Sequence, residues 1–482
     1  MSVAQLSNYG LQVISPIILV HLLTVSDFGQ YREFLVYGTL LNAFASFSIN
    51  DSLLYFVARH PDSAWRVVRR TAMLVACTSL AAALLMIGLD MALGGALVGA
   101  YRTPLALYVL FFANLDFWES FLLARNQLGP TFAYTTGRLL ARVLVVIAVA
   151  MSTTDIRTII WSLVALEAAR LVISASVWQF ARRDRSEPPV PDLGREQLRF
   201  CVPAGMGVLL NVANRSLGNL WVTKLLGPAA LAQFTIGAYG EPIVSSLRNA
   251  ISTVLLPEMV RRNASAGTDP LALWQRTTVV NCILLFPICV LVLRYAEPLI
   301  VTVFGAKFRP AIPLLQIYTL IIVRSCFDFA PPLRAANKTA PIMLSNLASI
   351  IANAIGLAFL IPSMGLEGAM IALTSASFVD AAYLCDSTRR LYKVPLAHLL
   401  PWGAIVKVVL AAATAVVVIL SPAWTRVLGP AGMIPAGMVY LGAFTVLLRV
   451  SGVDEGRVLL QRLATSARRA AGFIRARRQD GK

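Results

Sequence analysis

Long apolar stretches recur along the whole chain, separated by short polar segments. A helix needs about 20 mostly apolar residues to cross a bilayer, and fourteen such stretches can be placed in the sequence. They cover residues 3–24, 32–58, 71–93, 104–124, 130–151, 157–180, 200–223, 229–256, 277–295, 311–333, 339–361, 366–388, 400–421 and 430–450. The pattern predicts an all-α polytopic membrane protein with about 14 transmembrane helices.

Composition agrees with this prediction. Of the 482 residues, 57% are hydrophobic and 14% are charged, whereas soluble domains carry about 25% charged residues. The six cysteines show no Cys-x-x-Cys spacing and there are only three histidines, so we expect neither a zinc site nor a disulfide framework. No cofactor is expected. No basic segment precedes the first apolar stretch, so a cleavable signal is not expected either.

Basic residues alternate from one connection to the next, and they account for the net charge of +18. Alternate connections and the C-terminal tail hold 26 lysines and arginines, and the intervening connections hold six. The positive-inside rule therefore places both termini and the basic connections in the cytoplasm. We expect a multi-pass protein of the inner (plasma) membrane. Because this pattern explains the charge, nucleic acid is not an expected partner.

A charged, proline-rich segment divides the chain into two halves, as a solvated linker does. The predicted parts are an N-terminal lobe of six helices at 1–181, a cytoplasmic linker at 182–199, a C-terminal lobe of six helices at 200–391, two additional helices at 392–450, and a tail at 451–482. In the tail, residues 454–478 place leucines and alanines at helical spacing between arginines. This pattern predicts a basic amphipathic helix on the cytoplasmic membrane surface. A solvated tail that only enforces orientation is the alternative.

Several predicted spans carry charged or amide side chains in their middle, where a charge costs about 2.5 kcal/mol or more unless it faces a bundle interior or a water-filled cavity. In the span 200–223, Arg215 shares a helical face with Asn211, and Asn214 lies beside it. The following span places Glu241 and Arg248 on one face. Polar stripes on two successive helices indicate that a cavity lies between helices.

Arginine dominates these intramembrane charges, and its guanidinium recognises phosphate or carboxylate with two parallel hydrogen bonds. We therefore predict an anion-binding cavity. The candidate ligands are Arg215, Arg248, Arg138, Arg142, Arg324, Asn211 and Asn214. The candidate charge partners or coupling groups are Asp116, Glu119, Glu241 and Asp328. The alternative is structural pairing: Arg324 with Asp328, Arg170 with Glu167, and Arg138 and Arg142 with Asp116 and Glu119.

Four segments carry a resemblance to a known family. LLGPAALAQFTIGAYGEPIVSSLRNAISTVLLPEM (225–259) resembles the seventh-to-eighth helix signature of bacterial polysaccharide flippases. FGAKFRPAIPLLQI (304–317) is similar to the loop before their tenth helix, and residues 337–379 resemble their eleventh and twelfth helices. VHLLTVSDFGQY (20–31) resembles their first loop. The family is the O-antigen (Wzx-type) flippase branch of the multidrug/oligosaccharidyl-lipid/polysaccharide exporter superfamily.

This resemblance implies a MATE-like fold of two six-helix lobes plus two C-terminal helices. It implies a flippase, not an enzyme, that moves an undecaprenyl-diphosphate-linked oligosaccharide from the cytoplasmic to the periplasmic leaflet by alternating access. The expected partners are that lipid-linked oligosaccharide and membrane lipids, with polysaccharide assembly proteins as a further class. One departure concerns Gly218, which aligns where relatives often have an Asp in the seventh helix, and this leaves ion coupling through that helix open.

Three other functions stay open at this stage. A lipid II flippase would suit the same cavity, whereas a drug or cation exporter of the superfamily would not be expected to line it with arginine. A membrane-embedded glycan ligase or polymerase usually needs a sizeable outside loop with acid-base groups. The largest outside loop, about 296–310, holds Glu297 as its only acid, and the sequence contains no P-loop.

Overall fold

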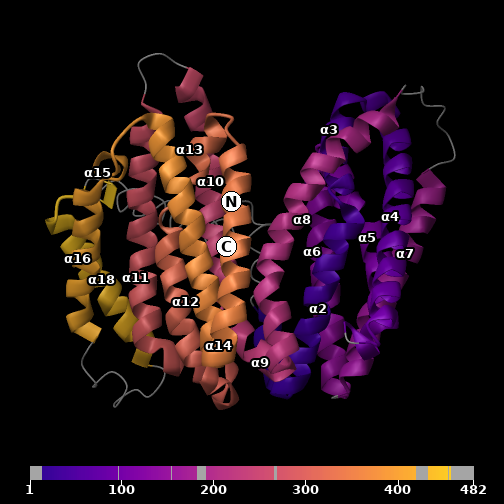
Figure 1. Ribbon diagram of the computed structural model, residues 1–482, viewed down its shortest axis with the longest axis horizontal. Coiled ribbons are helices and arrows are strands. Elements are labelled where there is room, and N and C mark those ends of the chain that lie inside the picture. The colour runs from indigo at the N-terminus through magenta and orange to yellow at the C-terminus, as the bar shows by residue number, and fades with distance from the viewer. Residues whose placement is uncertain are drawn as a thin grey trace, which may run out of the picture. The chain divides into compact units, whose positions relative to one another are not determined.

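A computed structural model describes residues 14–95, 97–153, 155–181, 192–264, 269–419, 432–453 and 455–456 (Figure 1). Every regular element in these residues is a helix, which confirms the all-α prediction. After a first helical segment at 14–22, the α-helices are α2 (Val25–Ser46), α3 (Ile49–Arg59), α4 (Ala64–Ala92), α5 (Arg102–Ala124), α6 (Leu128–Ser152), α7 (Ile156–Ala181), α8 (Leu193–Leu226), α9 (Pro228–Gly237), α10 (Glu241–Ala264), α11 (Pro270–Phe304), α12 (Ile312–Ser325), α13 (Ala330–Ala335), α14 (Ala340–Tyr392), α15 (Leu396–Leu399), α16 (Trp402–Ile419) and α18 (Met433–Val450).

The helices account for the apolar stretches of the sequence. Within the described residues, eight helices are long and apolar enough to cross a membrane, or nine if the bent pair α2 and α3 is one span. The 53 residues of α14 are two helices joined at Gly365, which has a φ of 58°. This break falls between the predicted spans 339–361 and 366–388. The predicted number of about 14 spans stays a prediction.

Three stretches expected to be continuous spans are each two helices. The stretch 32–58 bends by 41° between α2 and α3, where Phe47 and Ser48 have φ values of 40° and 55°. The stretch 229–256 breaks between α9 and α10, and 311–333 breaks between α12 and α13. In the last case Pro331 and Pro332 cannot donate the backbone hydrogen bonds that would continue α12. Hydropathy alone does not report such breaks, so the sequence predicts these stretches without showing where each helix is interrupted.

The chain divides into two compact units, Met1–Ile236 with Asn353–Leu373, and Gly237–Ala352 with Thr374–Lys482. In the first unit α5 packs on α2, α3, α4, α6 and α7, and α8 packs on α2 and α3. In the second unit α11 packs on α10, α12 and α16, and α16 packs on α18. The predicted parts 1–181, 200–391 and 392–450 stay predictions. The linker 182–199 and the tail 451–482 lie largely outside the described residues.

Helix α8 lies close against α3 and α4 through small and polar residues. Gln197 is fully buried and donates from Nε2 to the hydroxyls of Ser52 and Thr71, each at 2.8 Å. Further along α8, a Cβ on Gly205 would lie 2.6 Å from the ring and from the backbone oxygen of Phe47. Small residues and side-chain hydrogen bonds are typical of helix pairs in membranes. These contacts fix the position of α8 against α3 and α4.

Hydrogen bonds also hold α5 to its neighbours. Asn114 donates to the Ser79 hydroxyl of α4 at 3.0 Å. The Tyr134 hydroxyl of α6 donates to the Leu115 carbonyl of α5 at 2.9 Å. These hydrogen bonds hold α5 against both α4 and α6. They thereby fix the position of the α5 side chains Tyr108, Phe112 and Asp116.

Candidate binding cavity

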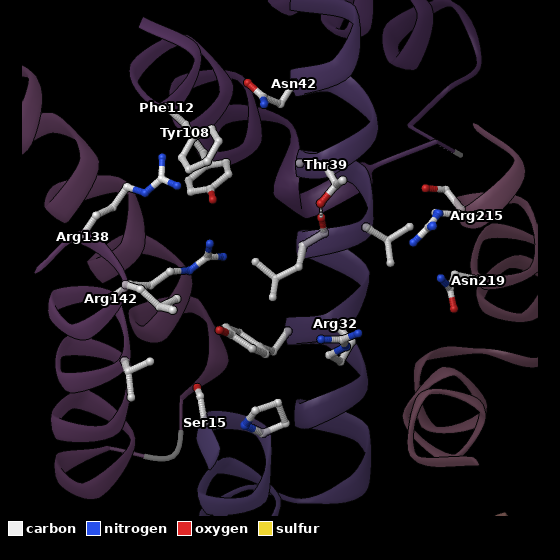
Figure 2. A pocket seen from close by; sticks show the side chains of 18 of the residues that line it. Ser15, Arg32, Thr39, Asn42, Tyr108, Phe112, Arg138, Arg142, Arg215 and Asn219 are labelled. Carbon is white, nitrogen blue, oxygen red and sulfur yellow. Dashed lines mark hydrogen bonds between the residues drawn. The ribbon is translucent and has the colours of Figure 1, made fainter. Parts of the chain in front are cut away.

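A cavity of about 580 Å³ lies among α2, α5, α6 and α8 of the first unit, next to residues 15–16 (Figure 2). This volume is in the range of about 300–1,000 Å³ that is usual for small-molecule sites. Its charged lining residues are Arg32, Arg138, Arg142, Arg215 and Asp116. Four guanidinium groups and one carboxylate leave this lining with three net positive charges.

Two matched rows of side chains form one wall of the cavity. Tyr108, Phe112 and Asp116 follow one another at four-residue spacing on α5, and Arg138 and Arg142 do the same on α6, so each row lies on one face of its helix. The Tyr108 and Phe112 rings stack with centroids 5.4 Å apart. The Arg138 guanidinium lies 5.8 Å from the Phe112 ring, and that of Arg142 lies 5.9 Å from the Tyr108 ring. Each arginine thus has an aromatic face as its support.

The two arginines of this wall differ in how their charge is balanced. Arg138 donates to Asp116 at 2.6 Å and to Glu119 at 3.3 Å. Within the described residues no carboxylate forms an ion pair with Arg142, whose guanidinium lies over the Tyr108 ring instead. The sequence left open whether Asp116 and Glu119 pair with Arg138 and Arg142. In the described residues they pair with Arg138 only.

Glu167 is the acid that interacts electrostatically with Arg142 at longer range. It forms an ion pair with Arg170, three residues further along α7, as the structural alternative for that pair proposed. The Arg170 guanidinium also donates to the Tyr134 hydroxyl at 3.0 Å. Glu167 is therefore already committed to another guanidinium, and Arg142 keeps its charge for the cavity.

The remaining two arginines come from other helices. Figure 2 shows Arg138 and Arg142 entering from α6, Arg32 on α2, and Arg215 with Asn219 on α8. Arg32 was missed in the sequence, because it was taken as the edge of the span 32–58. In the structure α2 begins at Val25, after Thr24 caps its first turn. Arg32 was detectable, because it shares a helical face with Thr39 and Asn42, seven and ten residues further on.

The other predicted ligands of the first unit lie beside the cavity. Asn211 and Asn214 are on α8, within one turn of Arg215, but the cavity lining does not include them. Asn211 is exposed. The described part of the chain contains no group of three or more His, Cys, Asp or Glu residues that could hold a metal ion.

Arg324 and Asp328 of the second unit do not pair as expected. Arg324 forms an ion pair with Asp380 and donates to the Ser377 carbonyl at 3.2 Å. The reason is that α12 ends at Ser325, so Asp328 is not one helical turn above Arg324. Asp328 instead accepts a hydrogen bond from Ser252 at 3.2 Å.

Glu241 and Arg248 also belong to the second unit, on α10. Glu241 accepts a hydrogen bond of 2.5 Å from the Tyr318 hydroxyl. Arg248 is half-buried and lies within electrostatic range of Arg324. Their roles as anion ligand and charge partner stay predictions.

Comparison with protein families shows which family the chain belongs to. A family model described as "Polysaccharide biosynthesis protein" matches residues 18–313, more than half of the chain. The chain belongs to this family. The matched range includes all four arginines of the cavity, and it confirms the resemblance to the polysaccharide flippase branch of the superfamily. A search of the curated proteins found no match.

Two solved structures show which fold this polysaccharide biosynthesis protein has. "Lipid II flippase MurJ, inward closed conformation" superposes with a TM-score of 0.67 at 14% identity, over 93% of this chain and 98% of that chain. An inward-facing multidrug resistance MATE family transporter of the MOP superfamily superposes with a TM-score of 0.52 at 14% identity, over 82% of this chain and 96% of that chain. At such identities the likeness shows the fold alone. The MATE-like fold predicted from the sequence is confirmed, and the chain is a multi-pass membrane protein.

Proposed function

We propose that this polysaccharide biosynthesis protein is a flippase that moves an undecaprenyl-diphosphate-linked oligosaccharide from the cytoplasmic to the periplasmic leaflet. The observation that carries the proposal is the cavity with four arginines and a single carboxylate. A diphosphate is the anionic group of such a lipid, and guanidinium binds phosphate oxygens with paired hydrogen bonds. A charge inside a membrane protein normally marks such a substrate pathway.

The arrangement of charges assigns different tasks to the arginines. Arg142 is the primary diphosphate ligand in this proposal, because no carboxylate pairs with it in the described residues and an aromatic ring supports it. Arg32 and Arg215 add charge from α2 and α8. Arg138 is held by Asp116 and keeps the wall of the cavity in position.

The remaining predicted residues keep a place in the proposal. Asn211, Asn214 and Arg248 are proposed as further polar contacts, whereas Arg324 is proposed to be structural because Asp380 neutralises it. Alternating access exposes the site to one leaflet and then to the other, and substrate drives the change only through the difference in its affinity for the two states. We also propose inner-membrane localisation with both termini cytoplasmic, as the basic residues indicate.

Lipid II is the second candidate substrate, because a lipid II flippase has the same fold and lipid II carries a diphosphate too. A drug or cation exporter is disfavoured by a cavity with three net positive charges. A ligase or polymerase is disfavoured because the cavity groups bind charge but include no activated nucleophile or base.

The test is a leaflet-translocation assay with the full-length protein in liposomes. The probes are a fluorescent undecaprenyl-diphosphate-linked oligosaccharide, lipid II and ethidium, each supplied to one leaflet. We expect transfer of the oligosaccharide lipid and none of ethidium. Transfer of lipid II alone would assign the second candidate. Transfer of ethidium alone would overturn the proposal.

A further inference from the structure

The chemical character of the cavity lining changes along α2, from Arg32 at one position to Asn42 further on. Asn42 is ten residues beyond Arg32 on α2, about 15 Å at 1.5 Å per residue, and Figure 2 shows Asn42 at the top of the view and Arg32 below its centre. Asn42 Nδ2 lies 3.5 Å from Asp116 Oδ2. Asn42 Oδ1 is buried and accepts no hydrogen bond within the described residues. Leaving a buried acceptor unsatisfied costs roughly 1–3 kcal/mol, so a hydrogen-bond donor supplied by a ligand would stabilise this oxygen.

Two further acceptors lie at the same end. Thr39 lines the cavity, and its hydroxyl donates to the Leu35 carbonyl at 2.8 Å, which leaves that oxygen with acceptor capacity only. Asp116 uses Oδ1 for Arg138 at 2.6 Å. Among the residues that the structure describes, its Oδ2 has only the long contact with Asn42, although a carboxylate accepts about four hydrogen bonds in all.

Three acceptors in one place select against an anion and for a group that donates hydrogen bonds. A diphosphate has only acceptor oxygens at neutral pH, so it belongs among the arginines. A sugar ring supplies several hydroxyl donors, each of which also accepts. A cation would satisfy the acceptors too, but Arg138 already occupies the Asp116 carboxylate and would repel it.

We propose that Asn42, Asp116 and Thr39 form a subsite for the sugar that is attached directly to the diphosphate. The inference rests on the proposed function. It adds which part of the substrate binds at each end of the cavity. The part of the cavity at Arg32 and Arg142 binds every polyprenyl diphosphate alike. The Asn42 end distinguishes a glycosylated diphosphate from a bare one.

The test compares two probes on the full-length protein in lipid nanodiscs. One probe is a short-chain polyprenyl diphosphate, and the other is the same lipid carrying one N-acetylglucosamine. For Asn42→Leu we expect about tenfold weaker binding of the glycosylated probe, the effect of one lost hydrogen bond to a group that is then left unsatisfied. Binding of the bare diphosphate should stay within about twofold of the wild type. Thr39→Val, which conserves shape, should act in the same direction.

Matched variants separate this inference from the proposed function. Arg142→Met should weaken both probes equally, and Arg294→Met in α11, outside the cavity lining, should weaken neither. If Arg142→Met changes neither probe, the placement of the diphosphate is wrong, whatever Asn42→Leu does. The sugar subsite is overturned if Asn42→Leu and Thr39→Val weaken both probes alike or leave both unchanged. Thermal unfolding of each variant confirms that it is folded, and if Asn42→Leu is not, Thr39→Val decides.

Discussion

Replacing Arg142 by methionine removes the guanidinium that has no carboxylate partner among the described residues. Each hydrogen bond to a charged group contributes about 1.5–3 kcal/mol, so a paired contact with a diphosphate is worth roughly 3–6 kcal/mol. Arg32 and Arg215 remain in the cavity and continue to hold the ligand. We therefore take the lower value, about 3 kcal/mol, which corresponds to roughly 100-fold weaker binding.

The same substitution should leave the fold intact. Methionine conserves most of the packing of the arginine stem, and no acid is left without its partner. The loss is the interaction with the Tyr108 ring, worth about 0.5–2 kcal/mol, and it is offset because a charge no longer has to be kept out of water. Arg142→Lys retains the charge without the paired geometry, so its affinity should fall between wild type and Arg142→Met.

Binding of a short-chain polyprenyl diphosphate to the protein in nanodiscs measures the effect, together with thermal unfolding of the same samples. The matched control is Arg294→Met in α11, which also removes an arginine from above an aromatic ring, 5.2 Å from the Tyr295 centroid, but lies outside the cavity lining. We expect wild-type affinity for that control. The reasoning is refuted if folded Arg142→Met binds the diphosphate as tightly as wild type, or if both substitutions weaken binding equally.

Three further predictions concern the scaffold and the topology. Arg138→Met should lower the free energy of unfolding by roughly 2 kcal/mol, less than the ~3–5 kcal/mol of a fully buried pair. Adding Asp116→Asn should recover part of that loss. Strictly additive effects of the two substitutions in chemical denaturation would contradict the ion pair. In a cysteine-free background, a cysteine at Asp192 should be inaccessible to a thiol reagent from the periplasmic side and one at Thr425 accessible, and labelling of both would contradict cytoplasmic basic connections. Deletion of 454–478 should leave a folded helical bundle by circular dichroism and size-exclusion chromatography, whereas loss of folded protein would show that the tail packs into the core.

The helices were predictable because a span needs a minimum length of apolar sequence and the sequence meets that need repeatedly. The breaks within spans were not. Phe47 and Ser48 are residues that ordinarily continue a helix or a strand, yet both adopt the left-handed conformation. Nothing in their hydropathy signals this, because the close approach of Gly205 to Phe47 is a contact between segments far apart in sequence.

For the cavity, too, some features could be predicted from the sequence and others could not. Arg138, Arg142 and Arg215 were found because charges in apolar stretches have a high energetic cost and need an explanation. Arg32 was missed because it lies where a hydropathy window ends. The difference between Arg138 and Arg142 was not accessible at all, since it depends on which residue of α5 lies opposite each guanidinium.

Because the charge balance of each arginine depends on the α5 residue opposite it, a transporter of this type can change its substrate through α5. Asp116 and Tyr108 sit two turns apart on α5 and meet Arg138 and Arg142, one turn apart on α6. The site of surplus positive charge is thus set by the order of side chains on α5, while the arginines themselves stay where they are. Exchanging the acid and the tyrosine would pair Arg142 with a carboxylate and leave Arg138, one turn or about 6 Å away, with the 3.3 Å contact to Glu119 alone. A flippase could thereby hold its diphosphate at a new depth, and accommodate a different headgroup, without gaining or losing a single arginine.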